Sequence, residues 1–134
     1  QDIFRLANFL QVPSYISLTT ALSYHGLTTQ VQRGFFESIS LKRTRKFEVA
    51  QFTFHYTKIN LDLYKGFERV EGVFIALPEK ALLDSLYLAS LGRYSLDASA
   101  LDLTKVKVEV LENLSLLFPS RVRTFMENCC GEIS

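Results

Sequence analysis

The sequence is poor in the residues that usually build disulfide and metal sites. Its 134 residues include only two cysteines, Cys129 and Cys130, which are adjacent. Neighbouring cysteines rarely form a structural disulfide because the geometry is strained. The two histidines, His25 and His55, lie far from them in the sequence, so a structural zinc site is not indicated. We therefore expect a reduced, cytoplasmic protein with no metal and no other cofactor.

Uninterrupted apolar stretches and a large charge excess are also missing. No stretch reaches the ~18 apolar residues that suggest a membrane-spanning helix. The 15 Lys and Arg residues and 14 Asp and Glu residues give a net charge of +1, so the domain does not bind nucleic acid as a polycation and any basic surface must be local. Residues 1–5 are neither a signal peptide nor an initiator methionine start. We expect the chain to begin inside a longer protein.

Apolar residues and phenylalanine are plentiful. Hydrophobic residues make up 48% of the chain and charged residues 22%, a balance typical of globular proteins. The 11 phenylalanines are expected to anchor a core. A chain of this length suits one domain, residues 1–134, that buries roughly 65–70% of the surface of its unfolded chain without a disulfide or a metal.

Periodicity predicts strands in the first half of the chain, after a short apolar lead-in over residues 1–13. Ser17 and Gly26 can cap the two ends of a short helix. Alternating apolar and polar residues then favour strands. The predicted extended segments are 35–41, 47–49, 51–57, 61–65 and 72–76.

The second half is predicted to be helical. Pro78 suits the first position of a helix that ends at Gly92, a further helix is expected from about residue 109, and Ser120 can cap the last one. Strands followed by helices indicate an α+β domain, a small, mainly antiparallel sheet with helices packed on one face and a helical C-terminal half.

A cluster of cations between two predicted strands is the most informative local feature. It consists of Lys42, Arg43, Thr44, Arg45 and Lys46. These side chains can fan outward and bind the phosphates of DNA, to which Thr44 adds a hydroxyl. The alternative is a solvated hairpin turn that protects a sheet edge from aggregation. Lys58 and Lys65 would extend the patch if strand pairing brings them near.

Candidate catalytic residues are few. His55 could act as a general base, but no Ser, Cys or carboxylate has a recognisable catalytic spacing to it, and His25 is placed to cap a helix end. Glu79, Lys80 and Asp84 could form a metal-dependent nuclease site. Because Lys80 and Asp84 are four residues apart, an ion pair within one helix is the simpler interpretation. We expect no catalytic residues and no enzyme.

Tyrosines and the last predicted helix offer a third interpretation. Tyrosine combines an apolar ring with a polar tip, so it serves cores and interfaces alike. Tyr24, Tyr56, Tyr64 and Tyr87 are predicted to be half-buried, and the helix after Ser120 carries an apolar face. The domain could therefore be a protein-interaction module that docks through these residues, although core packing is the default role for both.

Three segments together resemble the AbiEi family of antitoxins from bacterial toxin–antitoxin and abortive-infection systems. The segments are residues 13–27 (PSYISLTTALSYHGL), 42–56 (KRTRKFEVAQFTFHY) and 76–84 (ALPEKALLD). Their order and spacing are similar to those of the family, whereas the chain beyond residue 95 matches only in its helical character. Where the third motif usually has a capping Thr, this chain has Leu77.

The resemblance implies a non-enzymatic transcriptional regulator and antitoxin. Such proteins combine an N-terminal winged helix-turn-helix, which binds the promoter of their own operon, with a C-terminal domain of the present kind. We expect residues 1–134 to be that C-terminal domain, without the winged helix. The expected partners are promoter DNA, contacted along its backbone, with a nucleotidyltransferase-like toxin as a second candidate partner. The family offers no catalytic residues to transfer.

Overall fold

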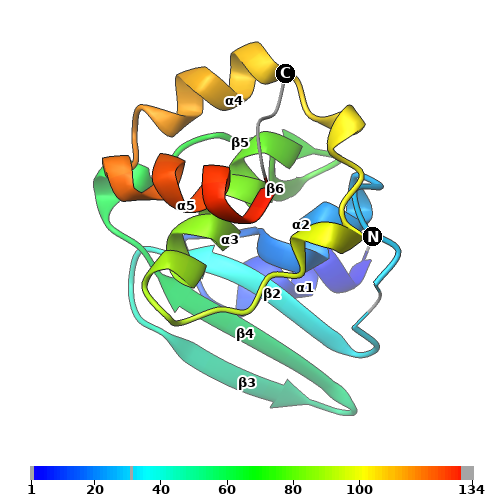
Figure 1. Ribbon diagram of the computed structural model, residues 1–134. Coiled ribbons are helices and arrows are strands. Elements are labelled where there is room, and N and C mark those ends of the chain that lie inside the picture. Colours follow the sequence, from blue (N-terminus) through cyan, green and yellow to red (C-terminus); the bar gives the residue numbers. More distant parts are fainter. Residues whose placement is uncertain (1, 31, 131–134) are drawn as a thin grey trace.

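A computed structural model describes residues 2–30 and 32–130, and side chains up to Asn128. A six-stranded sheet lies at the centre, with helices on both of its faces (Figure 1). The strands are β1 (Ser14–Ile16), β2 (Phe35–Ser40), β3 (Arg45–Val49), β4 (Phe52–Lys58), β5 (Phe67–Val70) and β6 (Val73–Ala76). The α-helices are α1 (Asp2–Leu10), α2 (Leu18–Tyr24), α3 (Pro78–Ser90), α4 (Val108–Ser115) and α5 (Ser120–Cys130). Three short 3₁₀ turns are η1 (Leu61–Leu63), η2 (Ala98–Ala100) and η3 (Leu103–Lys105).

The sheet is mixed, with the strand order β3-β4-β2-β1-β6-β5. The pairs β1–β2, β3–β4 and β5–β6 are antiparallel, whereas β2–β4 and β1–β6 are parallel. The predicted α+β class, with a mainly antiparallel sheet and a helical second half, is confirmed. Strands β3 and β5 form the two edges, so the basic cluster at the start of β3 lies on one rim of the sheet.

Helix α1 was not predicted, and it changes how the layers are arranged. Residues 2–10 form a helix with Phe4 and Ala7 buried. Phe4 packs edge-on against Phe36, and the Tyr56 hydroxyl donates a hydrogen bond to the Ala7 carbonyl. Neighbouring residues of a strand point to opposite faces of the sheet, and Tyr15 points to the face opposite to that of Phe36 and Tyr56, where it reaches α3. Helix α1 therefore covers one face of the sheet and α3 the other. The expectation of helices on one face only is therefore wrong.

The region after β4 also differs from the prediction. The segment expected to be extended, residues 61–65, contains the 3₁₀ turn η1 and a loop, and the strand β5 begins only at Phe67. Glu71 and Gly72, both with positive φ, form a two-residue connection between β5 and β6. Such turns match the natural twist of a hairpin. A Glu-Gly pair at this place is a signal that the sequence analysis passed over.

Helix α3 occupies the centre of the core and lies where the sequence predicts it. Every residue from Glu79 to Leu86 is buried, between the sheet on one side and α2, α4 and α5 on the others (Figure 1). Pro78 takes the first helical position, and Leu77, the N-cap residue, supplies no side-chain cap. Its main-chain N–H instead donates to the Gly66 carbonyl (2.9 Å). Although Leu77 replaces the capping Thr that is usual in the third motif, the start of α3 is still held by this bond to the loop before β5.

Candidate functional site

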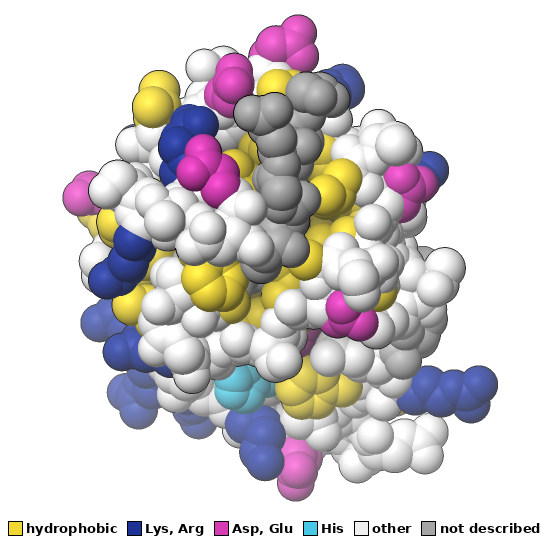
Figure 2. Space-filling model, in the orientation of Figure 1, with side chains coloured by type: hydrophobic (Ala, Val, Ile, Leu, Met, Phe, Trp, Pro, Cys, Tyr) yellow, Lys and Arg dark blue, Asp and Glu magenta, His cyan; other side chains and the backbone are white. Residues whose placement is uncertain are grey.

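The predicted cation cluster lies where β2 leads into β3. All five residues, Lys42 to Lys46, are exposed. Lys42, Arg43 and Thr44 lie in the connection, whereas Arg45 and Lys46 already belong to β3. Figure 2 shows Lys and Arg side chains gathered on this side of the molecule, at the left of the view. The cluster, hereafter the basic turn, is therefore a set of solvent-facing cations at a sheet edge.

Buried side chains hold the main chain of the basic turn in place. The Gln11 side-chain amide donates to the Arg43 carbonyl and to the Ser40 hydroxyl, both at 2.8 Å. The same Ser40 oxygen accepts the Lys42 N–H (3.2 Å), and the Thr44 hydroxyl accepts the Lys58 N–H (3.0 Å). The main chain of the turn is thus held at Lys42 and Arg43, and the Thr44 side chain is bonded to β4, while the cationic heads stay in solvent.

The cations of the basic turn have weak internal partners. Lys46 lies 3.9 Å from Glu48, but both side chains are more than half exposed, and such a pair contributes little. The Arg45 guanidinium lies 4.4 Å from the centre of the Phe47 ring, a cation–π contact that orients it without neutralising it. Among the described residues, Lys42 and Arg43 form no ion pair. The patch keeps its positive charge.

Strand pairing decides which further lysines join the basic turn. Lys58 pairs with Ser40 at the end of β2 and bonds Thr44 through its main chain, so it extends the patch. Lys65 lies in the loop before β5, the strand at the opposite edge of the sheet. Of the two lysines considered from the sequence, only Lys58 therefore belongs to this surface.

The contacts of the two histidines indicate structural roles for both. His55 stacks on Phe35, and its pKa is lowered by burial and, to a smaller extent, by the Lys46 cation. His25 is the C-cap residue of α2, and its Nε2 lies 2.7 Å from the Ala76 carbonyl oxygen in β6. His25 therefore fastens the end of α2 to the sheet in addition to capping the helix.

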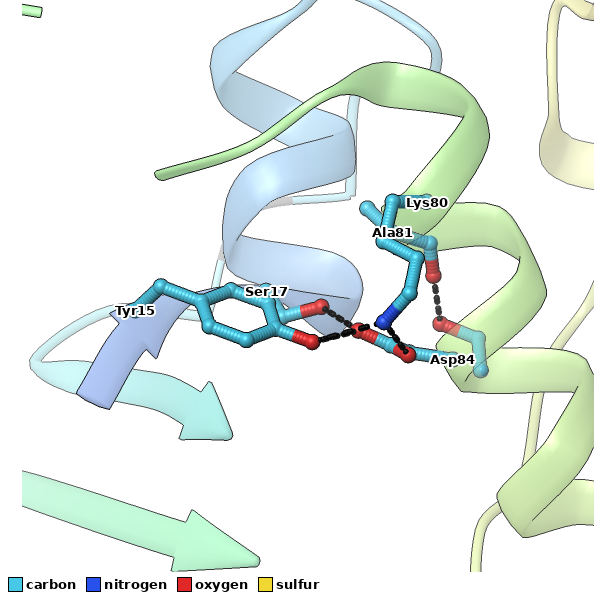
Figure 3. Close-up of polar contacts among 6 residues, drawn as sticks. Tyr15, Ser17, Lys80, Ala81 and Asp84 are labelled. Carbon is cyan, nitrogen blue, oxygen red and sulfur yellow. Dashed lines mark hydrogen bonds and ion pairs between the residues drawn. The ribbon is translucent and has the colours of Figure 1, made fainter. Parts of the chain in front are cut away.

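A sealed network of four polar residues joins β1, the start of α2 and α3 (Figure 3). Asp84 accepts hydrogen bonds from the Tyr15 hydroxyl (2.8 Å), the Ser17 hydroxyl (2.8 Å) and Lys80 Nζ (2.6 Å). Lys80 also donates to the Tyr15 oxygen (2.8 Å). The expected Lys80–Asp84 ion pair is confirmed, but it is buried, with both side chains 0% exposed. Ser17 stands at the predicted N-cap position, yet its hydroxyl bonds Asp84 and caps no backbone group.

The electrostatics of this network suit a structural role. Burial, followed by the charge of Asp84, raises the pKa of Tyr15 well above its usual value of 10.0, so the hydroxyl stays protonated and donates. The Lys80 ammonium lies 5.3 Å and 5.2 Å from the ring centres of Tyr15 and Phe118. A buried ion pair is tolerated when its remaining hydrogen-bonding capacity is satisfied, and these partners satisfy it.

The residues of the nuclease alternative do not converge on a common point. Glu79 is 3% exposed, and its carboxylate accepts the N–H of Lys107 at the start of α4 (2.8 Å). Lys80 and Asp84 face the sealed network instead. Within residues 2–30 and 32–130 there is no group of three or more His, Cys, Asp or Glu side chains that could hold a metal ion. A nucleic acid could reach this trio only if the core opened.

A second buried carboxylate was missed by the sequence analysis. Glu37 in β2 is 4% exposed and accepts hydrogen bonds from the Tyr94 hydroxyl (2.8 Å) and the Thr19 N–H (3.2 Å). Burial raises its pKa above 4.5, while the bond from Tyr94 opposes that rise. The sequence pattern that could have indicated its burial is the alternation of Glu37 with Phe35 and Ile39, which places all three on the face of the strand that points inward.

The tyrosines and the last helix mostly serve the core. Tyr56 is fully buried, and Val122 and Met126 of α5 belong to the hydrophobic core, as the default interpretation predicts. Tyr24, at the end of α2, is the exception among the four tyrosines, because it is 45% exposed. Three other exposed apolar side chains, Phe9 (76% exposed), Val12 (61%) and Phe74 (40%), line a groove of about 500 Å³ between α1 and the β5–β6 hairpin.

Comparisons with known proteins add no assignment. No protein-family model matches the chain, and no curated protein or solved structure is significantly similar to it. In the part of the chain that the structure describes, no helix is both long enough and apolar enough to cross a membrane. The family resemblance accordingly remains a prediction from the three motifs.

Proposed function

We propose that residues 1–134 act in the bacterial cytoplasm as a non-enzymatic AbiEi-type antitoxin and transcriptional-regulator domain. In this proposal the basic turn contacts the phosphate backbone of the promoter DNA of its own operon, and the protein counters a nucleotidyltransferase-like toxin. The observation that carries the DNA contact is the exposure of Lys42–Lys46 on a domain whose net charge is only +1. The antitoxin role is supported by the three motifs.

The arrangement of the basic turn suits contact with a polyanion. Its tethered main chain reduces the conformational entropy that would be lost on binding. Arginine can bind a phosphate through two parallel hydrogen bonds, and each neutralised phosphate releases condensed counterions from DNA. Contacts of this kind add affinity and fix orientation but do not read sequence. The proposed role is therefore to strengthen and position the complex.

The alternative of a solvated turn that protects the β3 edge explains the charge but not the tethering. Edge protection needs only charged side chains, whereas Gln11 and Ser40 hold the main chain of this turn. The nuclease alternative requires access to Lys80 and Asp84, which are fully buried. These observations favour the DNA-contact proposal over both.

Removing Arg43 and Arg45 tests the proposed contact. We expect Arg43→Ala/Arg45→Ala to weaken binding of the full-length protein to its operon promoter about 30-fold, at about 1 kcal/mol for each exposed charge-assisted contact. A gel-shift titration at fixed salt measures this. Lys65→Ala/Arg69→Ala removes the same charge near the opposite edge of the sheet and should leave the affinity nearly unchanged. Equal effects of the two double variants would contradict a localised contact.

The antitoxin role is tested separately in cells. The protein should restore growth of bacteria that express the nucleotidyltransferase-like product of the neighbouring gene. Failure to restore growth, with promoter binding intact, would contradict the antitoxin part of the proposal and leave the DNA contact standing.

A further inference from the structure

A polar hollow of about 300 Å³ lies beside the basic turn. Three segments that are far apart in the sequence form it: the β2–β3 connection, the end of β4 and the C-terminal end of α3. In Figure 1 the ends of β4 and α3 lie on the left side of the molecule, as the basic turn does. The polar residues that line the hollow are Thr44, Lys58, Asn60, Tyr87 and Arg93.

The charge of the hollow is positive. Lys58 and Arg93 are both exposed, and neither forms an ion pair within the described part of the chain. Of the described residues, none that lines the hollow is acidic. Two cations without a competing carboxylate favour an anionic ligand.

The end of α3 places Arg93 at the hollow. The Arg93 N–H donates to the Leu88 carbonyl and the Gly92 N–H to the Ala89 carbonyl, both at 2.9 Å. Gly92 has a φ of +73°, so this is a Schellman ending of the helix. The bonds satisfy carbonyls of the last turn that would otherwise repel an anion, and they fix the residue that carries the guanidinium.

Neutral donors complete the hollow. The Thr44 hydroxyl already accepts the Lys58 N–H, and a hydroxyl has a single proton to donate. Within the described residues that proton has no acceptor, and the Asn60 side chain does not cap η1. An ammonium, a guanidinium, a hydroxyl and an amide thus line one space, a donor set that suits the several oxygens of a phosphate.

We propose that this hollow binds a phosphate group and that in the cell the group is a backbone phosphodiester of DNA lying along the basic turn. The assignment to DNA rests on the proposed function. Thr44 belongs to both surfaces, so a strand that contacts Arg43 and Arg45 passes the mouth of the hollow. Arg93 and Lys58 then hold one phosphate in a fixed place and set the orientation of the domain on the duplex.

Two measurements on the full chain test the proposal with Arg93→Gln and the matched control Arg69→Gln. In the first, inorganic phosphate is titrated at constant ionic strength, and amide NMR shifts are followed. We expect saturable shifts at Lys58, Asn60 and Arg93 that Arg93→Gln weakens and Arg69→Gln does not. In the second, Arg93→Gln should weaken promoter DNA binding about fivefold, the same loss for one exposed charge-assisted contact as is expected for each of Arg43 and Arg45. Because both arginines are exposed, thermal unfolding should show both variants folded.

The outcomes separate this inference from the proposed function. Suppose that phosphate causes no shifts and that Arg93→Gln does not change DNA affinity, while Arg43→Ala/Arg45→Ala still weakens it. The proposal of a phosphate site in the hollow is then wrong, and the proposed function stands. Saturable phosphate shifts with DNA affinity unchanged in Arg93→Gln overturn the assignment to DNA and assign the hollow to free phosphate. Phosphate shifts with no effect of Arg43→Ala/Arg45→Ala support the phosphate site and contradict the proposed function.

Discussion

Lys80 and Asp84 are charged residues from which solvent is excluded, and each depends on the other. With one partner removed, the remaining charge would be buried without compensation, which costs far more than the pair contributes. Tyr15 and Ser17 add hydrogen bonds from β1 and from the start of α2. At the scale of single residues, this network is the point at which three elements are locked together.

A mutant cycle tests this dependence. We expect Asp84→Ala to lower the free energy of unfolding by about 3–5 kcal/mol, because it leaves the Lys80 cation buried and unpaired. The double variant Lys80→Met/Asp84→Ala should lose less than the sum of the two single losses, with a coupling of about 2 kcal/mol. Urea unfolding measures all four proteins. Strict additivity would show that the two charges do not stabilise each other.

Gly66 packs against the stem of Lys80 and offers a second test. A Cβ at this position would lie 2.9 Å from Lys80 Cγ, and the backbone has a φ of +79°. Gly92 has a similar φ of +73° but nothing within 4 Å of the same atom. Gly92→Ala should therefore cost about 1–2 kcal/mol of backbone strain alone, and Gly66→Ala should cost at least 1 kcal/mol more because the Lys80 stem must move. Equal losses in thermal unfolding would contradict the close packing.

Glu37 makes stability depend on pH. Burial raises its pKa in the folded state above 4.5, so the folded protein binds this proton more tightly than the unfolded chain. The resulting stability is fully present below pH 4.5 and is lost as the pH rises through the higher folded-state pKa. Glu37→Gln keeps an acceptor for Tyr94 and does not titrate. The stability of the wild type relative to Glu37→Gln should therefore fall from pH 4 to pH 7 in urea unfolding, and a constant difference would refute the assignment.

Elements with strong local signals were predicted well, and elements held by distant contacts were not. Helix α3 begins with Pro78 and ends before Gly92, and β6 is a continuous apolar run, so both lie where the sequence indicates. Helix α1 has only nine residues, too few to be stable alone. Its stability comes from Phe36 and Tyr56, more than 25 positions away, which no local pattern reveals.

Asn8 is the residue of α1 that bonds the main chain of β6. Its side chain accepts the Phe74 N–H (2.7 Å) and donates to the Phe74 carbonyl (3.3 Å). We expect Asn8→Ala to destabilise the protein by about 1–2 kcal/mol, the contribution of two hydrogen bonds, and to speed hydrogen exchange of the α1 amides. Phe9→Ala on the same helix, at a 76% exposed position, should change stability by less than about 0.5 kcal/mol. Similar behaviour of both variants would contradict this docking role.

For the whole molecule, the sequence identified the basic turn but not the surface around it. A run of cations between two strands predicts an exposed patch, and all five residues are exposed. Whether Lys58 joins the patch depends on the parallel pairing of β4 with β2, and Arg93 joins it only because α3 ends beside β4. Such neighbours follow from topology, which single-strand periodicity does not determine.

The salt dependence of promoter binding tests the central claim most directly, because it counts the phosphates that the protein neutralises. The logarithm of the association constant should fall linearly with the logarithm of salt concentration, with a slope of about −0.9 for each phosphate contacted. We predict that Arg43→Ala/Arg45→Ala reduces the size of this slope by about 1.8, and that Lys65→Ala/Arg69→Ala leaves it unchanged. A slope that is the same in the wild type and in Arg43→Ala/Arg45→Ala would show that the basic turn is a solvated edge and not a DNA contact.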